Sequence, residues 1–196
     1  VFRNALEQTR FACLDTIYEA ERILLVGEGD GRFLAKLTSI NTDCKITVLD
    51  TSPSMLALAK TRVSPVFQGK IQFCKEDAKT FPFPAESFDA VVSHFFLDCF
   101  NEKTLTILLK KLSSTLRPNG KWLIADFAEP SLNTLPGLLQ FLSLRILYIF
   151  FRFSCGIEAR RVISPHKILK ANGLIESHSS SYFKGLLKSM VFIKKY

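Results

Sequence analysis

Residues 23 to 33 read Ile-Leu-Leu-Val-Gly-Glu-Gly-Asp-Gly-Arg-Phe, an apolar run that passes directly into glycines at every second position. A short apolar run that ends in glycine is typical of a buried strand. Glycine tolerates the backbone of a sharp turn and leaves the main chain bare where a ligand can approach it. We therefore expect a buried strand that turns into a helix and forms part of a nucleotide-binding pocket.

Strand-like and helical segments alternate along the next hundred residues. Ser52-Pro53 predicts a helix start after the strand at residues 47–50, because serine is a typical cap and proline suits the first helical position. Further strands are expected at residues 71–74, at the end of the 81–93 passage, and after a turn within 116–124. This alternation predicts an α/β fold: a Rossmann-like, doubly wound and mostly parallel sheet with helices on both faces.

The spacing of the glycines separates two classes of nucleotide pocket. Dinucleotide-binding folds favour G-x-G-x-x-G, but the third position of that pattern holds Arg32 here. Gly27, Gly29 and Gly31 instead resemble the G-x-G-x-G of class I S-adenosylmethionine-dependent methyltransferases. The passages at 81–93 and 116–124 are also similar to that family, so the resemblance covers residues 20 to 127 strongly.

The resemblance implies S-adenosylmethionine as cofactor and S-adenosylhomocysteine as product. In that family an acid at the end of the second strand binds the ribose hydroxyls, and Asp50 matches it. An acid followed by a small residue contacts the adenine, which corresponds to Asp77 and Ala78. The cofactor-binding residues implied in this way are Gly27, Glu28, Gly29, Gly31, Asp50, Thr51, Met55, Asp77, Ala78, Ser93 and His94.

The chain is expected to form a single methyltransferase domain over residues 1–196. With 47% hydrophobic residues it can bury one sizeable core. We assign 20–127 to the cofactor-binding core, 130–162 to an apolar helical insert or lid, and 163–196 to a final helix, capped by Ser164, and strands. The last strand, near 190–193, is expected to be antiparallel, and this third part weakly resembles the ubiquinone/menaquinone-biosynthesis and type 11 methyltransferases.

Residues 135–153 form the most apolar segment and predict a helix. A transmembrane span needs roughly twenty uninterrupted apolar residues, and Arg145 at the centre would cost about 3 kcal/mol, so we do not expect it to cross a bilayer. Arg145, Tyr148 and Arg152 fall on one helical stripe, a narrow cationic edge beside a wide apolar surface. The helix could pack into the core, cover the substrate pocket, or lie on a membrane to collect a lipophilic acceptor.

Candidate catalytic residues follow the fourth strand, in the loop at residues 93–100. Methyl transfer is an in-line displacement that requires positioning and no metal, but an acceptor that carries a proton also requires a base. His94 and Asp98 are the candidates; alternatively, His94 lines the cofactor pocket and Asp98 caps the following helix. The substrate pocket is expected to contain Phe95, Phe96, Arg145 and Tyr148.

Charge is unevenly distributed between the two halves of the chain. Residues 1–98 carry a net charge of −2, whereas residues 99–196 carry +10. A basic half can be a solvated surface or can attract an anionic substrate, an anionic membrane or nucleic acid. The Asn/Asp-Pro-Pro-Tyr motif of amino-methylating nucleic-acid enzymes is absent, since residues 93–96 read Ser-His-Phe-Phe. Nucleic acid is therefore disfavoured, and a small-molecule acceptor with peripheral contact to an anionic membrane is expected.

Three functions agree with these features. The first is a methyltransferase for a small, lipophilic or aromatic acceptor, the second a nucleic-acid or protein methyltransferase, and the third an S-adenosylmethionine-binding adaptor without catalysis. The five cysteines are scattered and include no C-x-x-C pair, which favours a reducing compartment. A cytoplasmic location is therefore expected, and the apolar helix and the basic half of the chain add the expectation of peripheral membrane contact. The sequence leaves the acceptor atom and the oligomeric state open.

Overall fold

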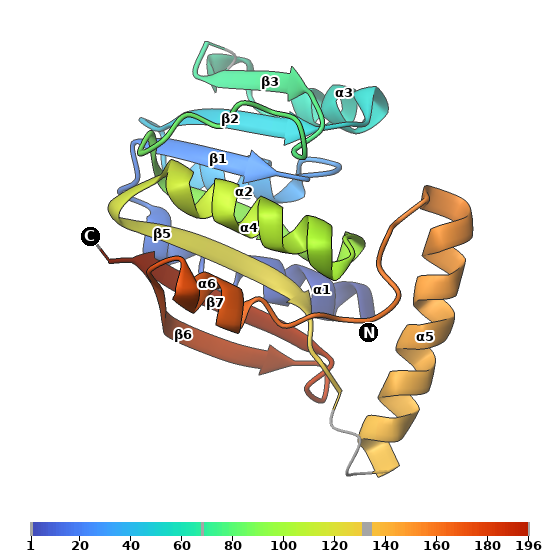
Figure 1. Ribbon diagram of the computed structural model, residues 1–196. Coiled ribbons are helices and arrows are strands. Elements are labelled where there is room, and N and C mark those ends of the chain that lie inside the picture. The colour runs from blue at the N-terminus through green and yellow to red at the C-terminus, as the bar shows by residue number, and fades with distance from the viewer. Residues whose placement is uncertain (1, 68, 131–134, 196) are drawn as a thin grey trace.

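A single seven-stranded sheet forms the centre of the computed structural model, which describes residues 2–67, 69–130 and 135–195 (Figure 1). The strands are β1 Arg22–Val26, β2 Lys45–Asp50, β3 Ile71–Lys75, β4 Phe88–His94, β5 Leu116–Phe127, β6 Leu174–Tyr182 and β7 Leu187–Lys194. Their spatial order is β3-β2-β1-β4-β5-β7-β6, and β7 runs antiparallel to both of its neighbours. The predicted doubly wound sheet and its antiparallel last strand are confirmed.

Helices cover both faces of this sheet. They are α1 Phe2–Phe11, α2 Arg32–Ile40, α3 Pro53–Arg62, α4 Glu102–Thr115, α5 Leu135–Cys155 and α6 His166–Ala171, with short 3-10 turns η1 Leu14–Ile17, η2 Pro65–Phe67 and η3 Leu97–Cys99. One face carries α1, α2 and α3, and the other carries α4 and α6 (Figure 1). Helix α5 stands apart, beyond the ends of the strands.

Strand β1 shows why its sequence is continuously apolar. Ile23 and Leu25 pack with α2 and α3, whereas Leu24 and Val26 pack with α4 on the opposite face. All four side chains are almost fully buried. A central parallel strand is covered on both sides, so neither of its faces can be polar.

The predicted helix starts are partly confirmed. Ser52 Oγ accepts a hydrogen bond from the Met55 N–H at 3.3 Å, and Pro53 is the first residue of α3. The equivalent prediction for α6 is wrong: Pro165 occupies the capping position, and the Ser164 hydroxyl instead lies 2.8 Å from His166 Nδ1. The Ser164 hydroxyl therefore interacts with the His166 side chain and not with a backbone N–H of the helix.

The turn predicted within residues 116–124 lies inside β5 as an irregularity. Phe88 of β4 pairs with Leu116, but Ala90 pairs with Lys121, so the register shifts between the two pairs. Asn119 has a φ of 63°, in the left-handed region that asparagine tolerates. The strand therefore begins earlier than predicted and contains the turn.

The glycine loop between β1 and α2 depends on left-handed backbone at three alternate residues. Gly27, Gly29 and Gly31 have φ values of 67°, 69° and 81°. A Cβ atom at Gly31 would lie 2.5 Å from the Cα of Ala59 in α3. The absence of a side chain at Gly31 is thus what allows the start of α2 to lie against α3.

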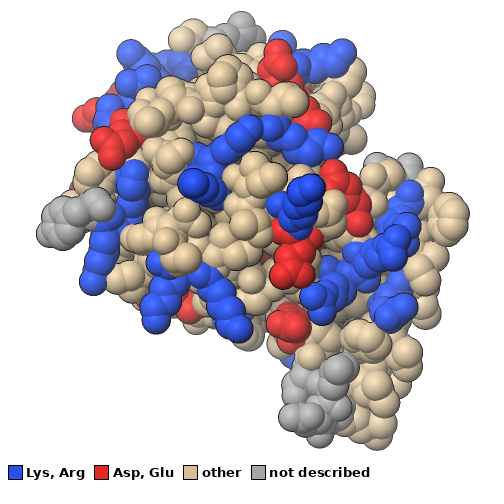
Figure 2. Space-filling view, viewed as in Figure 1, with Lys and Arg blue, Asp and Glu red and all other residues tan. Residues whose placement is uncertain are grey.

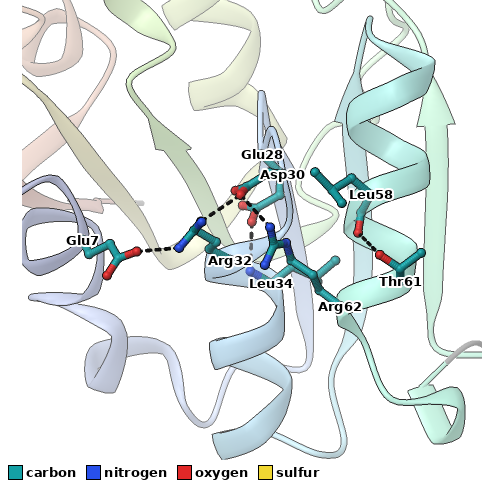
Figure 3. A network of polar contacts seen from close by, with 8 residues as sticks. All are labelled: Glu7, Glu28, Asp30, Arg32, Leu34, Leu58, Thr61 and Arg62. Atoms are coloured by element: carbon teal, nitrogen blue, oxygen red, sulfur yellow. Dashed lines mark hydrogen bonds and ion pairs between the residues drawn. The ribbon is translucent and has the colours of Figure 1, made fainter. Parts of the chain in front are cut away.

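Ion pairs connect this loop to three helices (Figure 3). Glu7 of α1 contacts Arg32 Nη1 at 2.7 Å, and Arg32 Nε contacts Asp30 Oδ2 at 2.8 Å. The same Asp30 oxygen lies 3.0 Å from Arg62 Nη2 at the end of α3. Partly exposed pairs contribute little stability one by one, but a connected set orients the loop. Arg32, which breaks the dinucleotide-binding pattern, is the centre of this network.

We expect Gly31→Ala to lower the free energy of unfolding by about 2 to 4 kcal/mol, because it adds left-handed strain to a clash with the α3 backbone. Gly185→Ala is the matched control, since Gly185 has a φ of 84° but no atom within 4 Å of its added Cβ. Urea unfolding of both variants measures the difference. Equal losses would show that Gly31 is not required for the approach of α2 to α3.

Candidate active site

A cleft of about 560 Å³ lies at the carboxyl ends of β1, β2 and β3. Six of the predicted cofactor-binding residues line it together: Gly27, Asp50, Thr51, Met55, Asp77 and Ala78. Strand ends at the reversal of strand order are where open α/β sheets bind ligands. The fold thus places residues from three separate passages around one cavity.

Asp50 joins the end of β2 to the glycine loop. Its Oδ2 accepts the Gly29 N–H at 3.1 Å, and its Oδ1 accepts the Ser52 N–H at 2.9 Å. The Gly27 N–H donates to the Leu49 carbonyl at 2.8 Å. A carboxylate has about four acceptor sites, so Asp50 keeps capacity for two hydroxyl donors in the cleft.

A charged bridge connects the two sides of the cleft. Lys79 Nζ lies 3.5 Å from Asp77 Oδ2 and 3.2 Å from Glu158 Oε1. Thr104 and Asn101 donate to Glu158 Oε2 at 2.8 and 2.6 Å, and the bond from Thr104 is the largest influence that lowers the pKa of Glu158. Sequence reasoning missed Lys79 and Glu158, because Glu158 lies far along the chain in a region that resembles the family weakly.

Aromatic side chains form the apolar wall of the cleft. Phe96 and Phe100 contact edge to face, with ring centroids 5.0 Å apart, and Ile157 lies beside them. A Cβ at Gly27 would come 2.3 Å from the Phe96 ring. Phe96, which was predicted for the substrate pocket, lines this cleft. Its ring packs directly against the backbone of Gly27.

A buried polar group lies behind this loop. The His94 ring packs edge to face on Phe33 at 4.6 Å, and burial, with a smaller contribution from Arg10, lowers the pKa of His94 to about 3. Within the described ranges, neither His94 Nδ1 nor Arg10 Nε has a hydrogen-bond partner. His94 is thus a neutral and weak base, and neither His94 nor Arg10 is among the residues that line the cleft.

Glu28 caps the following helix. Its Oε1 accepts the Leu34 N–H at 2.9 Å (Figure 3), a bond that Gly31 at the N-cap cannot make. Burial raises the pKa of Glu28 to about 7 against the opposing effect of this hydrogen bond. The structure places the Glu28 carboxyl at the N-terminus of α2, and it is not among the residues that line the cleft.

Ser93 and Gly31 also lie outside the cleft lining. Ser93 is fully buried, and its hydroxyl accepts a hydrogen bond from Trp122 Nε1 at 2.9 Å. Gly31 faces Ala59 of α3. Both residues therefore make packing contacts beneath the cleft and do not line it.

Two acids meet in a second hollow of about 320 Å³. The Asp98 N–H donates to Asp126 Oδ2 at 3.2 Å, which brings the two acids together. The Tyr148 hydroxyl of α5 donates to Asp98 Oδ2 at 3.2 Å. Burial raises the pKa of both acids, and the charge of Asp98 raises that of Asp126 further. Each negative charge in such a pair disfavours ionisation of the other carboxyl.

The turn η3 separates this hollow from the cleft. Phe96, Cys99 and Phe100 line the cleft, whereas Leu97 and Asp98 line the second hollow. The remaining wall of the hollow comes from residues 162–166 and from β7. The two cavities therefore share one short segment that follows β4.

The predicted substrate-pocket residues are not brought into one cavity. Tyr148 is 3% exposed and its hydroxyl reaches the acid pair, and it also lines, together with exposed Arg145, a separate hollow of about 150 Å³. The Phe95 ring packs on Phe127 at 5.7 Å, with the Arg10 guanidinium 5.3 Å from its centroid. Sequence spacing put Arg145 and Tyr148 on one stripe, but only Tyr148 turns inward.

Histidines outside the site have local partners. His166 Nε2 lies 3.0 Å from Glu176 Oε2, and His178 Nε2 lies 2.8 Å from Ser180 Oγ. Among the residues that the structure describes, no three His, Cys, Asp or Glu side chains are grouped so as to hold a metal ion.

Known proteins similar to this chain are methyltransferases. Residues 23–120, half of the chain, match the family described as "Methyltransferase domain". The ubiquinone/menaquinone biosynthesis C-methyltransferase UbiE of Teredinibacter turnerae is 26% identical over 136 residues, covering 68% of this chain and 54% of that protein. UbiE of Methylobacterium nodulans is 31% identical over 121 residues, covering 62% and 47%. The chain spans about half the length of these relatives.

A solved structure has the same fold. The N-methyltransferase NodS from Bradyrhizobium japonicum, crystallised in complex with S-adenosyl-L-homocysteine, superposes with a TM-score of 0.72. The match covers 97% of this chain and 88% of that one at 17% identity. The likeness extends through α5 and the last two strands, which the sequence match to the family leaves out.

Between pH 5 and pH 8, we expect the free energy of unfolding of the wild type to fall by about 2 kcal/mol more than that of Glu28→Gln. From pH 5 upward the unfolded Glu28 has mostly lost its proton, while the folded residue keeps it until the pH reaches its pKa of about 7. The folded state therefore binds more protons, and raising the pH favours unfolding. Glutamine retains the acceptor for Leu34 without titrating.

Urea unfolding at several pH values measures this difference. Glu21→Gln, an exposed position before β1, is the matched control and should follow the wild type. If the free energy of unfolding changed with pH in the same way in Glu28→Gln and in the wild type, Glu28 would not titrate in this range.

Proposed function

The chain belongs to the class I S-adenosylmethionine-dependent methyltransferases, and we propose that it transfers the methyl group to a small, lipophilic or aromatic acceptor that loses a proton. The observation that carries this proposal is the pair of cavities on either side of η3. One presents the family's cofactor-binding residues, and the other presents a buried acid pair between apolar walls.

We propose that the cofactor is held at both of its ends. We assign the ribose hydroxyls to the free acceptor sites of Asp50, and the adenine to Asp77 and Ala78. Arg10 Nε and His94 Nδ1, buried without partners among the described residues, would take the amino-acid end beyond the glycine loop. A buried polar atom without a partner costs about 1 to 3 kcal/mol, and a ligand that bonds to it recovers that cost.

The bound cofactor supplies an electrophilic methyl group: its carbon bonds to the acceptor atom while the C–S bond breaks and its electron pair stays on sulfur. The protein must hold the acceptor atom behind that carbon and exclude water. Phe96, Phe100 and Ile157 supply the apolar wall on the cofactor side. The Lys79–Glu158 bridge at 3.2 Å closes the same cleft.

Asp98 is the residue that we propose takes the proton. His94 is disfavoured as the base because its lowered pKa makes it a weak one. Burial raises the pKa of Asp98, which makes its carboxylate a stronger base than an exposed aspartate. Asp126 Oδ2 accepts the Asp98 N–H, and the Tyr148 hydroxyl holds Asp98 in place.

The chemistry of the second hollow supports a lipophilic aromatic acceptor. Its apolar wall consists of Leu97, Phe127, Val162, Ile163 and Met190. Relatives are named as C-methyltransferases of ubiquinone and menaquinone biosynthesis. A phenol or hydroquinone offers an aromatic ring together with a proton for Asp98 to accept.

Transfer of tritiated methyl from S-adenosylmethionine to a panel of alkylated phenols and hydroquinones tests this function. The dimethyl ether of each hydroquinone is the matched control, because it keeps the ring and the tail but has no hydroxyl proton. Label in the free hydroxyl compounds alone supports the proposal. Label in amines, protein or nucleic acid, or in the ethers equally, would contradict it.

Asp50→Asn is expected to weaken S-adenosylmethionine binding by about 10- to 100-fold, because hydrogen bonds to a charged acceptor are worth about 1.5 to 3 kcal/mol. Calorimetric titration measures the affinity. Asp43→Asn, an exposed residue before the opposite end of β2, is the matched control and should bind normally. Unchanged affinity in folded Asp50→Asn would remove Asp50 from the ribose site.

Asp98→Asn is expected to lower kcat about 100-fold or more, while S-adenosylmethionine affinity stays within about threefold. The wild-type kcat should rise with pH until Asp98 is ionised, because the base acts without its proton. Tyr148→Phe should move this rise to higher pH, since the hydrogen bond from Tyr148 lowers the pKa of Asp98.

His94→Ala provides the contrast for Asp98→Asn. It should weaken cofactor binding and leave the pH profile unchanged, because we place His94 at the cofactor. A lost pH dependence in His94→Ala, with a normal profile in Asp98→Asn, would assign the proton to His94 instead.

A further inference from the structure

Helix α5 exposes a continuous apolar face. Leu135, Ile146 and Phe153 are 71%, 70% and 90% exposed. Among the side chains of this helix that the structure describes, the large apolar ones that are exposed are Leu135, Leu138, Leu139, Leu142, Ile146, Ile149, Phe150 and Phe153. Scattered exposed apolar residues are ordinary, but a contiguous patch of this size marks an interaction surface.

Helical spacing places this face away from the protein body. Leu144 and Tyr148 are buried against the body with Ala159. Ile146 and Phe153 lie roughly half a turn around the helix from Leu144, at about 100° per residue. The exposed residues recur at intervals of three and four, as in a helix that lies at an apolar boundary. Figure 1 shows α5 standing apart from the sheet.

Arginines follow one edge of the apolar face. Arg145 and Arg152 are seven residues apart on the same side of α5, and both are exposed. Arg145, Arg160 and Arg161 line one hollow of about 150 Å³, to which Glu129 contributes an opposing charge. Residues 135–155 include no acidic residue. Figure 2 shows basic side chains gathered over the lobe that contains α5.

We propose that α5 binds in the plane of an anionic lipid bilayer. The apolar face enters the boundary between headgroups and acyl chains, and the arginine edge meets the lipid phosphates in and beside the hollow. A bilayer presents anionic groups directly beside apolar chains, which are the two chemistries that α5 exposes side by side. No helix among the described residues has the length and apolar run needed to cross a membrane.

A second copy of this chain is a poorer fit to the same surface. It could cover the apolar residues, but it would bring a further edge of arginines in place of anionic groups. The proposal is also independent of the proposed acceptor, because binding to vesicles requires neither cofactor nor catalysis.

Flotation of the whole protein with vesicles tests the proposal. Vesicles of phosphatidylcholine with phosphatidylglycerol are compared with vesicles of phosphatidylcholine alone, at low and at high salt. We expect at least tenfold tighter binding to the anionic vesicles, and weaker binding when salt is raised. Equal binding to both lipids, or no binding to either, would overturn the proposal.

Two sets of variants assign the binding to α5. Ile146→Gln/Ile149→Gln/Phe153→Gln removes apolar contact, and Arg152→Gln/Arg160→Gln removes charge. Each should weaken binding at least tenfold while the circular dichroism spectrum stays unchanged. If the first set does not fold, Leu138→Gln/Leu142→Gln makes the same test on the other half of the helix.

Val66→Gln/Ile107→Gln is the matched apolar control, because both residues are exposed outside α5. It should bind vesicles as the wild type does. Equal losses in this control would show that the binding is not specific to α5. Sedimentation velocity without lipid tests whether copies of the chain associate through this face instead. Self-association that the α5 variants abolish, together with no vesicle binding, would overturn the proposal.

Discussion

The sharp reversal at the end of β1 is the constraint on which the rest of the site depends. Three left-handed glycines, at positions 27, 29 and 31, turn the chain within five residues. Each glycine has a different neighbour. The Phe96 ring lies against Gly27, the Asp50 carboxylate accepts the Gly29 N–H, and α3 lies against Gly31. The turn thus sets where the second strand ends, where the third helix packs and where the cleft wall closes. Few other residue types could occupy these positions, because a side chain at 27 or 31 would overlap atoms of the fold itself.

The segment after α5 connects the apolar insert to both cavities. The N–H groups of Glu158 and Ala159 donate to the Cys99 carbonyl at 2.8 and 3.1 Å, so the segment is bound to η3. Glu158 reaches the cofactor cleft through Lys79, while Tyr148 reaches the acid pair through Asp98. A displacement of α5 would therefore disturb the mouth of one cavity and the carboxyl pair of the other. In this arrangement, a surface to which α5 binds also lies next to the site of the proposed reaction.

The sequence predicted the fold and identified six of the residues that line the cleft, because both depend on local signals. Alternating glycines, an acid at a strand end and Ser52-Pro53 at a helix start each act within a few residues. Only one member of the acid pair was predicted. Asp98 lies in the loop that the sequence singled out, whereas Asp126 belongs to β5, and only the tertiary fold brings the two together. For the same reason Glu158 and Arg10 carried no signal in the sequence. Periodicity identified the stripe on α5 but left open which of its residues faces the protein.

The crystal structure of the protein with S-adenosylhomocysteine tests most directly whether the cofactor's sulfur faces the hollow that contains Asp98. Our account requires the ribose hydroxyls to bond to Asp50, the amino-acid end to bond to Arg10 and His94, and the sulfur atom to point toward the side of η3 that carries Asp98. A cofactor bound in this cleft with its sulfur directed away from Asp98 would contradict the assignment of the second hollow to the acceptor. A cofactor bound outside the cleft would contradict the account as a whole.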